Sequence, residues 1–139
     1  MEALRPIVES DARPVEKLRQ AIRAHVRVVT GDLAAATVYF HEWKALQGER
    51  RERFLAYRRE YEGLLRRVVE EGMATGALNP QADPKFATVL ILSAVNWLYQ
   101  WYRPDGPLSP DEIAERFGHL ILSGIGAGAE KVLAIHQLT

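Results

Sequence analysis

The amino-acid sequence predicts an all-α fold, organised as one domain of five or six helices. Apolar residues recur at spacings of three and four along almost the whole chain, which is the period of an α-helix. The alternation at two that marks a β-strand is absent. Prolines and glycines divide the chain into segments of helical length, and 139 residues suit a single core.

Two helices are expected in the first part of the chain. A short helix covers residues 2–9. A second begins at Pro14, because proline suits the first helical turn, and it ends near Gly31. Its apolar stripe consists of Val15, Leu18, Ile22, Val26 and Val29.

Two further helices are expected in the middle of the chain. One follows Asp32 and closes at Gly48. The next is long, over residues 49–75, with apolar residues on one face and arginine and glutamate crowding the other. Gly76 is expected to cap its C-terminus, because glycine adopts the left-handed conformation that ends many helices.

Local capping residues define the last two helices. Asp83-Pro84 predicts an N-cap followed by a proline in the first turn, and the helix is expected to run over residues 85–103. After a loop, the segment Ser109-Pro110-Asp111-Glu112 is a full capping box. It opens a helix over residues 110–125.

The composition argues against several classes of protein. Lysine plus arginine and aspartate plus glutamate are equal at 18 each, whereas modules that grip nucleic acid usually carry a basic excess. The chain has no cysteine for a disulfide or a thiolate metal site. Its start is too polar for a signal peptide, and no window approaches the roughly 20 apolar residues of a membrane span. We therefore expect a cytoplasmic protein.

No arrangement of residues predicts catalysis, a metal site or a cofactor. His41 and Glu42 begin like a zinc-protease helix, but Ala45 stands where the second histidine is required. The glycine-rich run at 124–128 follows a helix rather than a strand, so it lacks the scaffold of a dinucleotide site. A helix-turn-helix at 28–40 is rejected, because its second helix offers no arginine to base edges. We expect neither an enzyme nor specific DNA binding by this chain.

The helix over 85–103 is apolar around most of its circumference and contains four aromatic rings between Trp97 and Tyr102. Such a helix must be covered nearly all round, and a chain this short has too few helices to cover it. A second copy of the chain is the expected cover, with two helices from each subunit in a four-helix bundle. The alternative is that the rings fill the core of a monomer. The expected interface comprises Ala94, Trp97, Leu98, Trp101, Phe117, Leu120, Ile121 and Gly124.

The same helix carries neutral polar residues within an arc of about 140°, namely Thr88, Ser93, Asn96 and Gln100. Buried polar groups need partners, which are either other protein groups or a ligand in a pocket between helices. If the arc faces the long helix, it meets Tyr57 and Tyr61, and His25 completes the lining, although a lone histidine is more often a satisfied core residue. The candidate ligand-binding residues are His25, Phe40, Tyr57, Tyr61, Leu65, Val89, Leu92, Ser93, Asn96 and Gln100.

Four segments together resemble the C-terminal domain of TetR-family transcriptional regulators. They are PVEKLRQAIRAHV (14–26), EEGMATGALNP (70–80), the Asp-Pro opening at 83–84, and NWLYQWYRPDGPLSPDEIAERFGHLILSGI (96–125). The resemblance is closest to the branch that contains regulators of fatty-acid and sterol catabolism. It implies a core over residues 14–126, a linker helix within 1–13 and a tail over 127–139.

The resemblance also implies a mechanism. Such proteins are homodimers in which a small hydrophobic ligand, often an acyl-CoA or related lipid, enters a pocket in each C-terminal domain and releases the repressor from operator DNA. The N-terminal helix-turn-helix head of this family has no counterpart here, so we expect operator DNA to be bound only through that missing domain. The rival hypothesis is a stand-alone helical protein-interaction module without a small-molecule ligand.

Overall fold

The structure is a computed structural model in which residues 3–125 are described. It confirms the all-α fold class, because these residues form helices and loops and no strand. The helices are α1 (Leu4–Glu9), α2 (Pro14–Gly31), α3 (Leu33–Glu42), the 3-10 helix η1 (Trp43–Ala45), α4 (Gly48–Ala74), α5 (Pro84–Asn96), α6 (Leu98–Trp101) and α7 (Pro110–Ile125). The tail expected over 127–139 lies outside the described residues.

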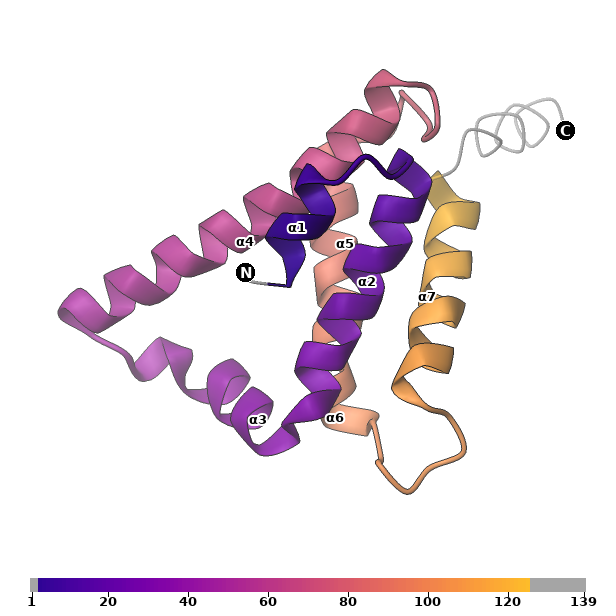
Figure 1. Ribbon diagram of the computed structural model, residues 1–139. Coiled ribbons are helices and arrows are strands. Elements are labelled where there is room, and N and C mark those ends of the chain that lie inside the picture. The colour runs from indigo at the N-terminus through magenta and orange to yellow at the C-terminus, as the bar shows by residue number, and fades with distance from the viewer. Residues whose placement is uncertain (1–2, 126–139) are drawn as a thin grey trace, which may run out of the picture.

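Helix α2 is the central element, and it contacts every other α-helix of the described chain. Helices α4 and α7 flank it on opposite sides, and α5 lies behind it (Figure 1). The stripe expected on α2 provides this packing, since Leu18, Ile22 and Val26 are at most 1% exposed. None of the described helices combines the length and apolar character that crossing a bilayer requires.

The capping residues predicted from the sequence make the expected contacts. The Asp83 side chain accepts hydrogen bonds from the backbone N–H groups of Lys85 (2.9 Å) and Phe86 (3.1 Å). The Ser109 hydroxyl accepts from the Glu112 backbone N–H at 3.1 Å and donates to the Glu112 carboxylate at 3.2 Å. These two caps fix the first residues of α5 and α7. The start of each helix in turn determines which of its residues face α2.

Polar contacts tie the outer helices to the centre. The Lys17 side chain of α2 is buried, and its ammonium donates to the Val8 carbonyl of α1 at 2.9 Å and to the Glu71 carboxylate of α4 at 3.1 Å. At the other end of α2, Arg27 donates two 3.0 Å hydrogen bonds to the Asp111 carboxylate in the first turn of α7. Buried ammonium groups need such partners.

Two helices differ from their predicted form. The helix expected over 85–103 is divided into α5 and α6 at Trp97, where the Gln100 N–H bonds the Trp97 carbonyl three residues back and tightens the turn. The helix expected to reach Gly48 instead ends at Glu42 and continues as η1. Gly48 has a φ of 60° and is the first residue of α4, so it serves the start of α4 rather than the end of α3.

The end of α4 leads to a stability prediction at Gly72. The chain turns at Gly76, which has a φ of 79°, and brings the fully buried Leu78 back onto Gly72. A Cβ at Gly72 would lie 2.6 Å from Cγ and Cδ1 of Leu78. Gly72→Ala is therefore expected to lower the free energy of unfolding by about 1–3 kcal/mol, measured by urea denaturation.

Gly63 provides the matched control on the same helix. A Cβ added at Gly63 would meet nothing within 4 Å. Gly63→Ala should raise the free energy of unfolding by roughly 0.5–1 kcal/mol, because alanine loses less conformational entropy in a helix. Equal stability of the two variants would contradict the packing of Leu78 against Gly72.

Candidate functional site

The structure contains a cavity of about 590 Å³ bounded by α2, α3, η1, α4 and α5. Helix α4 diverges from α2 toward its N-terminus, and α3 lies between that end of α4 and the C-terminal end of α2 (Figure 1). Six aromatic side chains contribute to the lining, namely Tyr39, Phe40, Trp43, Phe54, Tyr57 and Tyr61. A cavity of this size with a largely apolar wall and a few polar groups is typical of small-molecule sites.

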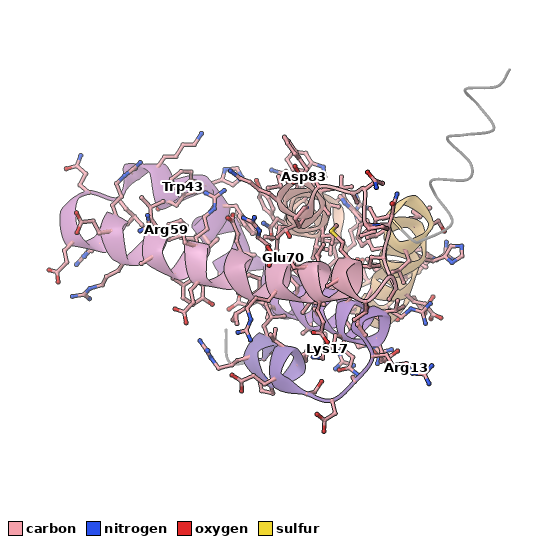
Figure 2. All side chains as sticks on the ribbon, turned by 90° about the horizontal axis from the view of Figure 1, so that it is seen from above. Arg13, Lys17, Trp43, Arg59, Glu70 and Asp83 are labelled. Atoms are coloured by element: carbon pink, nitrogen blue, oxygen red, sulfur yellow. The ribbon has the colours of Figure 1, made fainter. Side chains whose placement is uncertain are left out.

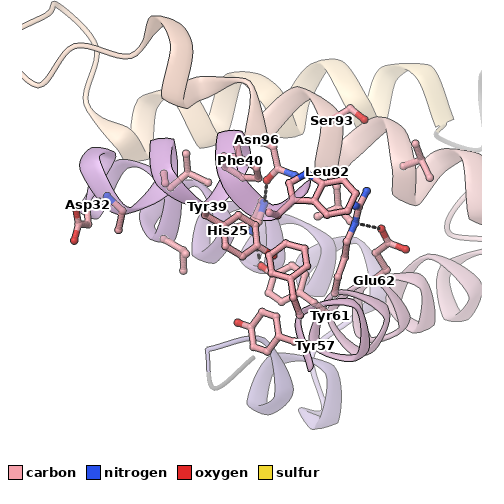
Figure 3. Close-up of a pocket in the computed structure, with 18 residues that line it drawn as sticks. His25, Asp32, Tyr39, Phe40, Tyr57, Tyr61, Glu62, Leu92, Ser93 and Asn96 are labelled. Atoms are coloured by element: carbon pink, nitrogen blue, oxygen red, sulfur yellow. Dashed lines mark hydrogen bonds and ion pairs between the residues drawn. The ribbon is translucent and has the colours of Figure 1, made fainter. Parts of the chain in front are cut away.

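Three polar side chains from three helices meet in the wall of this cavity (Figure 3). The His25 ring of α2 has its Nδ1 atom 2.6 Å from the Tyr61 hydroxyl of α4 and its Nε2 atom 2.6 Å from Oδ1 of Asn96 in α5. The amide oxygen can only accept, so Nε2 carries the hydrogen. Nδ1 of the neutral ring then accepts from the Tyr61 O–H, and all three groups are satisfied without a charge.

Burial keeps both titratable members of this cluster neutral. Removal from water lowers the pKa of His25 from 6.5 to about 4, although the hydrogen bond to Asn96 opposes the shift. Burial also raises the pKa of Tyr61, so its hydroxyl stays protonated. At neutral pH this part of the pocket therefore presents dipoles rather than ions, which suits an uncharged polar group of a ligand better than an anion.

The lowered pKa of His25 predicts a specific pH dependence. Between pH 6.5 and about pH 4 the imidazole of His25 is protonated in the unfolded chain but neutral in the folded chain. The neutral, buried His25 therefore contributes fully to the free energy of unfolding above pH 6.5. This contribution is lost as the pH falls from 6.5 toward 4. The free energy of unfolding should drop by about 2 kcal/mol between pH 7 and pH 5, measured by urea denaturation. His25→Gln, which keeps a donor and an acceptor but does not titrate, should lack that drop; an identical pH profile would contradict the burial of a neutral His25.

The side chains of α3 and η1 that line the cavity are at most partly buried. No residue of either element is classed as buried. Their inward side chains meet other rings across or beside the cavity: Tyr39 lies 4.7 Å from Phe54 and Phe40 lies 5.0 Å from Tyr99, between ring centroids. A ligand in the cavity would add contacts to these partly exposed side chains.

The structure brings together most of the residues predicted for the pocket and excludes two. His25, Phe40, Tyr57, Tyr61, Val89, Leu92, Ser93 and Asn96 line the cavity. Leu65 does not line the cavity, because it belongs to the core and is 3% exposed. Gln100 also lies outside the lining; it is exposed and donates to the Tyr99 hydroxyl at 2.8 Å.

Sequence reasoning missed the contribution of α3 and its surroundings to the cavity. Ala35, Ala36, Tyr39 and Trp43 line it from α3 and η1, and Phe54 faces them from α4. Only Phe40 was predicted from this region. The aromatic residues Tyr39 and Trp43, which are close to Phe40 in the sequence, could have indicated that the whole segment lines the cavity.

A second feature is an exposed apolar face on α5, α6 and α7. Phe86, Leu90, Trp97, Trp101 and Leu120 are between 46% and 74% exposed. Of the other residues predicted for the interface, Gly124 is exposed and Ala94 and Phe117 are partly buried. Large exposed apolar surfaces on soluble domains mark interaction sites.

The predicted interface needs two corrections and one extension. Leu98 is 0% exposed and Ile121 is also part of the core of the single chain, so neither is free to meet a second subunit. The apolar side of each helix is broad enough to include both residues of the core and residues of the outer face. Phe86 and Leu90 extend the exposed face by two turns toward the start of α5.

Comparison with known proteins identifies the fold and the family. A family model described as "Tetracyclin repressor-like, C-terminal domain" matches residues 11–125. The chain belongs to this family. The resemblance to TetR-family C-terminal domains is thus confirmed over nearly all of the described structure.

Three relatives illustrate the range of this tetracyclin repressor-like family. The HTH-type transcriptional repressor KstR2 of Mycobacterium tuberculosis is 25% identical over 122 residues, which cover 87% of this chain and 61% of KstR2. A TetR/AcrR-family regulator from Thermobifida fusca is 34% identical with a TM-score of 0.78, covering 88% of this chain and 64% of that one. AibR, solved with isovaleryl coenzyme A and operator DNA, is 29% identical with a TM-score of 0.75, covering 86% and 64% of the two chains.

The matched region is only part of these relatives. The chain spans about 61% of the length of KstR2 and 64% of the two solved regulators. What the family assignment establishes for this chain is a C-terminal regulatory domain.

Proposed function

We propose that this domain binds a small hydrophobic effector, an acyl-CoA or a related lipid thioester, in the cavity of each subunit of a homodimer. The observation that carries the proposal is the cavity of about 590 Å³ with the His25–Tyr61–Asn96 cluster in its wall. The apolar remainder of the wall suits an acyl chain, and the cluster adds polar groups to that wall without adding a charge. AibR, whose complex holds isovaleryl coenzyme A, supports the same ligand class.

The homodimer is supported by the exposed face of α5, α6 and α7. Its two largest members, Trp97 and Trp101, leave about half of their surface in water in the single chain. Obligate homodimer interfaces resemble a domain core cut in half and are enriched in aromatic residues. Packing this face against its symmetry mate forms a four-helix bundle from two copies of α5–α6 and α7.

The proposed output is control of transcription. In a longer chain of the kind the relatives have, a DNA-binding domain contacts the operator, and the two domains of a dimer must be correctly spaced to do so. A ligand that prefers one spacing, while DNA prefers the other, shifts the dimer away from DNA. The protein would then act in the cytoplasm as a ligand-released repressor and not as an enzyme.

A thermal-shift series with acyl-CoA esters of graded chain length tests the ligand. At 100 times its dissociation constant the right ester should stabilise the folded state by about 2.7 kcal/mol, or roughly 8 °C in Tm for a domain of this size. Free coenzyme A at the same concentration is the control. No shift with any ester would favour the rival function, a helical protein-interaction module that uses only the exposed apolar face.

A further inference from the structure

Three cationic side chains gather around one tryptophan at the edge of the cavity. The Arg58 and Arg51 guanidinium carbons lie 5.4 Å and 5.7 Å from the centroid of the Trp43 ring, and the Lys44 ammonium lies 6.0 Å from it. Trp43 and Arg58 also line the cavity. Figure 2 shows Trp43 and Arg13 toward opposite ends of the molecule, with the buried Lys17, which joins α1, α2 and α4, on the Arg13 side.

This group, here called the cationic rim, is an exception to the charge balance of the chain. From residue 44 through the first three turns of α4, to residue 59, six side chains are cationic and two are acidic, whereas the whole chain has equal numbers. Within this segment Arg53 pairs with Glu49 one turn away, and farther along α4 Arg66 pairs with a glutamate in the same way. Among the described residues, Lys44 and Arg51 form no ion pair, and both are exposed.

The ring of Trp43 joins the rim to the cavity. It stacks on Phe54 with an interplanar angle of 3° and a centroid distance of 5.6 Å, and both rings belong to the cavity wall. Cations beside an indole face are held in place by the ring, yet they keep their charge and most of their hydrogen-bond donors. An apolar cavity with unneutralised donors at its edge matches a ligand that has an apolar part and an anionic part.

We infer that the cationic rim of Lys44, Arg51 and Arg58 binds phosphate groups of the effector outside the cavity, an inference that rests on the proposed function. Coenzyme A carries its pyrophosphate and 3′-phosphate at the end remote from the thioester, so its acyl chain can occupy the cavity while its phosphates remain at the edge. Arg58 already pairs with Glu62 at 3.4 Å, and a phosphate would take over that donor. Charge-assisted hydrogen bonds from guanidinium groups to phosphate are among the stronger polar contacts.

The test compares two ligands that share an acyl chain but differ in phosphate. An acyl-CoA and the N-acetylcysteamine thioester of the same acid are titrated against the wild-type protein and the variant K44Q/R51Q. In the wild type the acyl-CoA should bind about tenfold more tightly or better, and this advantage should shrink as NaCl rises from about 50 to 500 mM. The double variant should lose the advantage while its affinity for the phosphate-free thioester stays within about twofold of the wild-type value.

Arg67→Gln is the matched control, because Arg67 is an exposed arginine of the same helix about 24 Å of helical rise from Arg51. It should leave both affinities unchanged. Equal acyl-CoA affinity in the wild type and the double variant would overturn the rim while leaving the proposed effector intact.

A third titration separates the two proposals. If neither thioester binds but adenosine 3′,5′-bisphosphate binds the wild type and not the double variant, the rim stands and the lipid effector fails. If none of the three ligands binds, both proposals are overturned.

Discussion

Trp97→Arg is expected to convert the proposed homodimer into a monomer. Trp97 is 58% exposed in the single chain and lies in the middle of the apolar face formed by α5, α6 and α7. In a twofold-symmetric dimer, arginine at this position would bury two unpaired charges in the interface, one from each subunit. A loss of about 3 kcal/mol for each copy corresponds to a roughly 10⁴-fold higher dissociation constant, measured by sedimentation velocity over a concentration series.

Val38→Arg is the control for this prediction. Val38 has nearly the same exposure, 57%, but it lies on α3 and is not part of the apolar face of α5, α6 and α7. It should leave the sedimentation coefficient unchanged. An intact dimer in Trp97→Arg, with circular dichroism showing a folded protein, would mean that another surface joins the subunits.

Ala36→Trp is expected to abolish effector binding. Ala36 lines the cavity from α3, and an indole side chain there would fill space that the acyl chain needs. Any ligand would have to displace a packed ring, so we expect the dissociation constant for an acyl-CoA to rise by at least about 100-fold, equivalent to about 3 kcal/mol. Isothermal titration calorimetry measures this directly, and the fold can be checked by the midpoint of thermal unfolding.

The neighbouring residue provides the comparison. Ala34 is exposed on the same helix and does not line the cavity. Ala34→Trp should bind the acyl-CoA as the wild type does. Retained binding in Ala36→Trp, or an equal loss in both variants, would place the effector outside the cavity.

The fold could be predicted from the sequence because its helix boundaries depend on local chemistry. Asp83 and Ser109 cap helices through side-chain contacts with backbone groups two or three residues away, and Gly76 supplies a left-handed turn. The division of α5 from α6 at Trp97 could not be predicted in this way. No proline or glycine marks that position, and the tightened turn appears only in the backbone hydrogen bonds of the folded chain.

The candidate site was predictable where polar residues interrupt an apolar helix. Asn96 and Ser93 mark the side of α5 that lines the cavity. On this side His25 contacts both Asn96 and Tyr61. Leu65 was predicted to line the cavity but lies in the core. Apolar residues that line a pocket and apolar residues of the core recur at the same helical spacing, so the sequence does not distinguish them. The cationic rim was missed for a different reason: Arg51 and Lys44 come together only because the Trp43 ring of η1 packs against side chains from the first turns of α4.

Native mass spectrometry of the wild-type protein, with and without an acyl-CoA, tests the ligand-binding homodimer most directly. We predict a species of twice the 15.7 kDa chain mass that gains one and then two ligand masses as the acyl-CoA is added. A species of one chain mass that acquires no ligand at acyl-CoA concentrations up to about 1 mM, a dissociation constant equivalent to only about 4 kcal/mol, would contradict both the twofold assembly and the effector site.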